Sequence, residues 1–127
     1  GQEDSIENHP WSSALIKNDN VFCGATIITS SYLLTAAHCI YSFLPSDITV
    51  LVGSERILDK RTGTKEIKVM HNHEQFNAVT FNNDIGLIKI KTSFIYGPKV
   101  QAVCLPTSEG NSSKYSELKY YNYRIMY

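Results

Sequence analysis

The feature that most constrains the fold is a series of short segments rich in β-branched and aromatic residues, separated by polar turn sequences. The apolar segments cover residues 14–17, 21–29, 32–35, 48–52, 66–71 and 85–91. Side chains of these types favour strands, and the residues between them tolerate turn geometries. No long segment carries a helical stripe of apolar residues. The pattern predicts six strands in an all-β sandwich or barrel, and by itself it does not choose between the two.

Two of these segments differ in their expected burial. Residues 66–69 alternate charged and apolar side chains, which predicts a strand with one face against a core. Residues 85–88 are apolar throughout, which predicts a strand that is buried on both faces.

Length and charge limit the classes of partner. A chain of 127 residues has the size of one domain. Twelve basic and twelve acidic residues give no net formal charge and form no like-charge block, so the sequence predicts no nucleic-acid partner. No apolar run approaches the roughly 20 residues that a membrane-spanning helix needs, so it predicts no membrane partner either.

Two motifs carry chemistry. Residues 34–39 read Leu-Thr-Ala-Ala-His-Cys and place His38 beside Cys39 where an apolar strand ends. Residues 82–90 read Asn-Asn-Asp-Ile-Gly-Leu-Ile-Lys-Ile and place Asp84 at the start of another apolar strand. Histidine suits a general base because it titrates near neutral pH, and a carboxylate can orient its ring. A lone histidine is more often a packed or solvated residue, but these two frames together indicate two members of a Ser-His-Asp triad.

The chain resembles the chymotrypsin/trypsin-like serine peptidases, in particular secreted arthropod-type trypsins. Further matches are His-Pro-Trp at 9–11, Phe-Cys-Gly-Ala-Thr-Ile-Ile at 22–28 and Ala-Val-Cys-Leu-Pro at 102–106. The resemblance covers residues 1–119 and implies an antiparallel six-stranded β-barrel, the first of the two barrels of the trypsin-like fold. It also implies His38 as general base, Asp84 as the residue that orients it, a protein or peptide substrate, a secreted location and no cofactor.

The resemblance has clear departures. The family's nucleophile lies in a Gly-Asp-Ser-Gly-Gly-Pro motif, and these 127 residues hold no Gly-x-Ser-x-Gly stretch. Mature family members begin with Ile-Val-Gly-Gly, whereas Gly1 resembles only the last residue of that tetrapeptide. We therefore expect residues 1–119 to be an incomplete N-terminal barrel that lacks its C-terminal barrel, and residues 120–127 to be a divergent tyrosine-rich tail. Such a chain is expected to be inactive alone. The alternative is a noncatalytic binding or regulatory protein on the same fold, either a truncated product or a pseudoenzyme.

The chain has three cysteines, an odd number that in a secreted protein suggests one bridge and one further thiol. The resemblance implies a disulfide between Cys23 and Cys39, which closes a loop that stabilises the fold by about 3 kcal/mol on a chain-entropy model. Two buried free thiols are the alternative. The resemblance implies that Cys104 bonds an N-terminal light chain or propeptide, with a free thiol as the alternative. Asn111 begins the only N-glycosylation sequon and is a possible glycan site.

Two acidic or histidine-rich segments are candidates for metal sites. His71, His73 and Glu74 are residue types that bind zinc, but their spacing argues against a site, and family members carry a similar stretch here. Glu55 and Glu66 do not align with the calcium loop of some trypsins. The sequence therefore predicts no metal site.

Overall fold

The computed structural model describes residues 6–53 and 64–103. Six strands carry the fold: β1 (Ser12–Lys17), β2 (Asn20–Ile27), β3 (Tyr32–Thr35), β4 (Thr49–Val52), β5 (Thr64–Asn72) and β6 (Gly86–Ile90). Within these two ranges, three short helices accompany them: η1 (Ile6–Asn8), α1 (Ala37–Ile40) and η2 (Pro45–Asp47). None of the helices in these ranges reaches the length and apolar character needed to span a bilayer.

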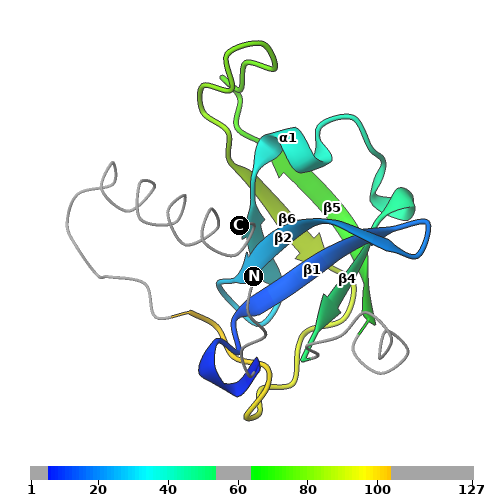
Figure 1. Cartoon of the computed structure of the whole chain (residues 1–127), viewed down its shortest axis with the longest axis vertical. Helices are drawn as coiled ribbons and strands as arrows, with labels where there is room; N and C mark the ends of the chain where they lie inside the picture. Colours follow the sequence, from blue (N-terminus) through cyan, green and yellow to red (C-terminus); the bar gives the residue numbers. More distant parts are fainter. Residues whose placement is uncertain (1–5, 54–63, 104–127) are drawn as a thin grey trace, which may run out of the picture.

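All neighbouring strands are antiparallel, and they close a barrel in the order β1-β2-β3-β6-β5-β4 (Figure 1). This confirms the expected six-stranded antiparallel barrel and excludes the sandwich. Closure leaves no open sheet edge within the described strands, which removes the sites where another chain could add a strand.

The hairpin between β1 and β2 shows how the polar residues set the turns. Lys17 pairs with Asn20, so the loop consists only of Asn18 and Asp19. Both have positive φ angles, 52° and 64°. A two-residue hairpin loop of type I′ needs positive φ at both positions, and Asn and Asp adopt that conformation more readily than other non-glycine residues.

The core fills the barrel interior with aliphatic side chains from every strand. The largest fully buried apolar residues are Leu15, Ile27, Leu33, Ile40, Val50 and Ile88. Five of them lie on strands, and Ile40 comes from α1. The short helix that follows β3 is therefore anchored by its own core residue.

The two strands with different expected burial behave in part as predicted. In β5, Ile67 is buried while Glu66 and Lys68 are exposed. In β6, Ile88 is buried, but Leu87 is only half-buried. The expectation that this segment is buried on both faces was therefore too strong, because the strand's outer face lies on the outside of a closed barrel rather than between two layers.

Three buried hydroxyl groups differ in their bonding. Ser13 Oγ donates to the carbonyl oxygen of Ala25 at 2.9 Å, and Thr35 Oγ1 donates to that of Gly24 at 2.8 Å. Thr26 is fully buried, and its Oγ1 has no hydrogen-bond partner within the described part of the chain. A buried hydroxyl without a partner loses its water without compensation.

Thr26 and Thr35 therefore form a matched pair for substitution by the similarly shaped valine. We expect Thr26→Val to raise the free energy of unfolding by about 1 kcal/mol, because it removes an unsatisfied donor. Thr35→Val should lower it by about 1 kcal/mol, because a formed hydrogen bond is lost. Urea denaturation of both variants measures the difference, and equal effects would contradict this account of the core.

Candidate active site

His38 is held by the short helix α1, which begins directly after β3. Ala36 is still extended, with φ −81° and ψ 138°, and the helix starts at the next residue. Ala36 and Ala37 are both buried, so small side chains let the chain turn close to the barrel. On the far side of His38, a disulfide joins Cys39 to Cys23 of β2, the pairing that the family resemblance implied. The helix is therefore fixed on both sides of the histidine.

Asp84 lies in the loop between β5 and β6, two residues before β6 begins. The loop is braced internally. Asn77 Oδ1 accepts hydrogen bonds from the amides of Val79 and Thr80 at 2.8 and 3.0 Å, and Asn83 Nδ2 donates to the carbonyl oxygen of Gln75 at 3.0 Å. These bonds give the carboxylate a defined position at the start of β6.

The pairing register of β3 with β6 brings the two segments together. Thr35 pairs with Gly86, so the last residue of β3 and the first of β6 lie side by side. His38 follows Thr35 in the chain and Asp84 precedes Gly86, so both lie at the same end of the barrel. They are 46 residues apart in sequence. A shift of one residue in the register would turn the alternate side chains of the strand to the opposite face.

Asp84 contacts His38 at two points. Its Oδ1 accepts a hydrogen bond from the backbone N–H of His38 at 2.7 Å, and its Oδ2 lies 2.5 Å from Nδ1 of the ring. The aspartate side chain is 11% exposed and the imidazole 30%. Because an ionised carboxylate only accepts hydrogen bonds, Nδ1 carries the proton and Nε2 keeps a free lone pair.

Aromatic side chains cover one face of the imidazole. The ring of Phe81 is stacked on that of His38, with centroids 5.0 Å apart and planes within 1° of parallel. Phe81 has a φ of 59°, a left-handed conformation that costs a bulky residue about 1–2 kcal/mol. Phe76 and Tyr41 extend the cluster. The ring centroid of Phe76 lies 6.2 Å from that of Phe81 and 5.5 Å from that of Tyr41. The Nε2 edge of the ring faces Cys39 instead, whose Sγ lies 3.7 Å away.

Gly86 allows α1 to approach β6. A Cβ atom on Gly86 would lie 2.8 Å from Cδ1 of Ile40 and 3.5 Å from the carbonyl oxygen of His71. Neither Gly86 nor Phe81 was predicted from the sequence to belong to the site. A glycine inside an otherwise apolar strand often marks a place where another segment approaches the backbone, and this signal could have indicated Gly86. Nothing in the sequence indicates the stacking of Phe81 on His38.

The residues weighed as metal ligands are placed elsewhere. His71 and Glu74 are exposed, and Nδ1 of His73 accepts a hydrogen bond from the amide of Gln75 at 3.0 Å. Glu66 forms an exposed ion pair with Lys91 at 3.3 Å. The only group of three potential metal ligands within residues 6–53 and 64–103 is Cys23, His38 and Cys39.

Four further predictions fall on parts of the chain outside the described residues. They concern the absence of a calcium site at Glu55, Cys104 as an interchain anchor, Asn111 as a glycan site and residues 120–127 as a divergent tail.

Comparisons with known proteins agree on one family. The family model for trypsin matches residues 1–118. Ovochymase of Halocynthia roretzi is 36% identical over 119 residues, which cover 84% of this chain and 7% of that protein. Trypsin alpha of Drosophila erecta is 28% identical over 143 aligned positions, which cover 99% of this chain and 56% of the trypsin.

A solved structure shares the fold. The crystal structure of the scabies mite inactivated protease paralogue S-D1 superimposes with a TM-score of 0.75 at 25% identity, over 84% of this chain and 45% of that one. The chain thus spans about half the length of the Drosophila trypsin and of the mite protein, and a small part of ovochymase.

The two-point contact of Asp84 predicts a measurable contribution to stability. We expect Asp84→Ala to lower the free energy of unfolding by about 1–3 kcal/mol, because a backbone N–H and a ring N–H lose their acceptor. Glu66→Ala is the matched control and should change it by less than about 0.5 kcal/mol, since its ion pair is exposed. Urea denaturation compares them, and an Asp84 effect as small as the control would contradict the role of this contact.

Substitutions of Gly86 should destabilise the fold more as the new side chain becomes larger. Gly86→Ala should lower the free energy of unfolding by less than about 1 kcal/mol, because the methyl end of Ile40 can rotate away. Gly86→Val should cost about 1–3 kcal/mol, because a branched side chain overpacks the gap between α1 and β6. The NMR signal of the Nδ1 proton of His38 should persist in the Gly86→Ala variant. Its loss would mean that the side chain of Ile40 cannot rotate away and that α1 is displaced instead.

Proposed function

Because the chain belongs to the trypsin family of serine proteases, we propose that its barrel supplies two members of a Ser-His-Asp triad that hydrolyses peptide bonds. His38 is the general base and Asp84 the residue that orients it. The observation that carries the proposal is the two-point contact of the Asp84 carboxylate with the backbone and ring of His38. It holds the imidazole in the tautomer in which Nε2 can accept a proton.

The chemistry follows from this tautomer. A serine hydroxyl is a weak nucleophile at neutral pH and needs a base during its attack on the peptide carbonyl carbon. Nε2 of His38 takes the hydroxyl proton, and the carboxylate of Asp84 stabilises the imidazolium that forms. The same proton then passes to the leaving amine, and water hydrolyses the acyl-enzyme in a second cycle. The substrate class is a protein or peptide.

The reaction needs groups that the family carries on its C-terminal barrel. These are the nucleophilic serine, the oxyanion donors and the pocket that selects the residue before the cut. A single oxyanion donor is worth roughly a hundredfold or more in rate. Residues 1–119 are therefore proposed as the N-terminal barrel unit and 120–127 as a divergent tail, and the 127 residues by themselves are proposed to be inactive.

Location and linkage complete the proposal. We place the protein outside the cell, because the Cys23–Cys39 disulfide is typical of oxidising compartments and the matched Drosophila proteins are trypsins. Cys104 is the proposed anchor of a disulfide-linked N-terminal light chain, and Asn111 the proposed glycan site.

A second candidate function is a noncatalytic binding or regulatory role on the same fold. It is favoured by one observation: the mite protein that shares the fold is described as an inactivated protease paralogue. A truncated product or a pseudoenzyme could keep His38 and Asp84 without hydrolysing peptides.

The first test uses the 127-residue chain itself. We expect the purified chain to hydrolyse peptide amide substrates no faster than its His38→Ala variant, because neither has a nucleophile or oxyanion donors. Release of a chromogenic amine measures the rate. Hydrolysis by the chain that disappears in His38→Ala would contradict the proposed division of the triad between two barrels.

The second test separates the two candidate functions on the native protein. Protein captured with an antibody to this chain is treated with a fluorophosphonate, which labels activated serines, and its mass is measured before and after reduction. A labelled species larger than 14.3 kDa is expected for the protease. An unlabelled species would favour the noncatalytic role, and loss of a second chain on reduction would support Cys104 as its anchor.

A further inference from the structure

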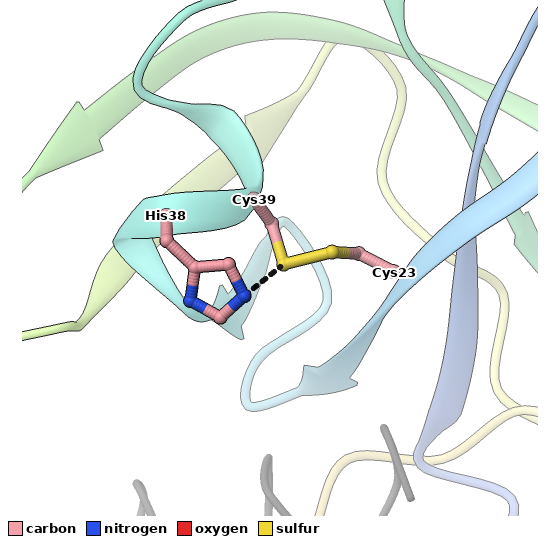
Figure 2. A group of neighbouring side chains, drawn as sticks. All are labelled: Cys23, His38 and Cys39. Atoms are coloured by element: carbon pink, nitrogen blue, oxygen red, sulfur yellow. Dashed lines mark hydrogen bonds between the residues drawn. A yellow bond between two sulfur atoms is a disulfide. The ribbon is translucent and has the colours of Figure 1, made fainter. Parts of the chain in front are cut away.

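Three soft or borderline metal ligands meet beside the proposed general base. The Sγ atoms of Cys23 and Cys39 and a ring nitrogen of His38 all lie within 4.8 Å of one another. In Figure 2 the imidazole of His38 and the side chain of Cys39 project from α1 toward the same point, and Cys23 reaches it from β2. In the oxidised chain the two sulfurs are bonded to each other, so neither is a thiolate ligand.

We propose that reduction of the Cys23–Cys39 disulfide converts this corner into a zinc site with two thiolates and the Nε2 atom of His38 as ligands. Two molecules of a small thiol reduce the bond, which yields two cysteine thiols and the reductant's own disulfide. Zn²⁺ then displaces the protons of both cysteine thiols and accepts the Nε2 lone pair. Thiolate and imidazole are the ligand types of tetrahedral zinc centres.

The distances suit this coordination. Nε2 of His38 lies 3.7 Å from Sγ of Cys39. Zinc–sulfur and zinc–nitrogen bonds of ordinary length at a tetrahedral angle place two such ligands about 3.6 Å apart. The Cα atoms of the two cysteines are 6.2 Å apart, so rotation of the side chains can separate the sulfurs without moving β2 or α1.

The other side of the imidazole is already arranged for a metal ligand. The Asp84 carboxylate holds Nδ1, which fixes the tautomer and turns Nε2 away from the aspartate. A histidine whose second nitrogen donates to a carboxylate is the usual arrangement at zinc sites, and loss of the carboxylate weakens metal binding. The imidazole is 30% exposed, so a metal ion and a fourth ligand from solvent can reach Nε2.

The site would compete with the proposed base. A metal on Nε2 occupies the lone pair that takes the serine proton, so the reduced, metal-bound form could not act as a base. This consequence rests on the proposed function, whereas the metal site itself does not. The two can therefore fail separately.

Cobalt titration tests the site on the full chain, with Cys104→Ser as background to remove the third thiol. The protein is reduced with a monothiol, freed of it without oxygen, and titrated with Co²⁺, whose visible spectrum reports tetrahedral thiolate coordination. We expect one Co²⁺ per reduced chain, displaced by Zn²⁺, and none on the oxidised chain. His38→Ala should weaken binding at least tenfold, and Asp84→Asn by roughly 10- to 100-fold. His71→Ala, an exposed histidine outside the cluster, is the matched control and should have no effect.

Several results would overturn the proposal. They are equal Co²⁺ affinity in His38→Ala, an octahedral spectrum, or one metal shared between two chains. Circular dichroism monitors the strands throughout. If reduction alone unfolds the barrel, the site predicts that Zn²⁺ restores the strand signal, because metal that binds only the folded chain stabilises it. Failure of Zn²⁺ to restore that signal would also overturn the proposal.

Discussion

The pairing of β3 with β6 is the constraint on which the site depends. It closes the barrel, and its register sets Thr35 opposite Gly86, so the chain leaving one strand and the chain entering the other meet at one corner. His38 lies just after β3 and Asp84 just before β6. Three further features stabilise this corner: the disulfide, the core residue Ile40 and the close approach at Gly86. The geometry of the His38–Asp84 pair therefore depends first on strand register and only then on the side chains.

Local patterns in the sequence were enough to predict the strands and the two motifs. Segments of β-branched residues bounded by turn residues indicated six strands, and Asn18 and Asp19 belong to the residue types that a tight hairpin needs. Properties that depend on contacts between distant segments were harder to predict from the sequence. The pattern did not distinguish a barrel from a sandwich, and it overstated the burial of Leu87. The stacking of Phe81 on His38 joins a loop to a helix and has no local signature. A four-residue helix such as α1 is too short to show periodicity.

The described barrel holds one part of the proposed site. The contact between His38 and Asp84 is complete within one barrel, whereas in the proposed function the nucleophile, the oxyanion donors and the specificity pocket belong to a second barrel. Such a division would allow proteins of this fold to differ in activity. The inactivated mite paralogue and the Drosophila trypsins both match this one chain. In the proposed function, the corner formed by His38 and Asp84 supplies the base, and a second barrel would supply the groups that determine whether hydrolysis takes place.

The sequence separation of the β3–β6 pair also bears on the order of folding. Neighbouring strands such as β1 and β2 can pair as soon as both are synthesised, but β6 joins β3 only after the intervening strands β4 and β5 have been made. Long-range pairing of this kind is slow because the chain loses loop entropy before the contacts form. A nascent chain that ends before Asp84 contains the histidine without anything to orient it. The oriented imidazole of His38 thus forms only when β6 joins the barrel, so its geometry indicates that the barrel has closed.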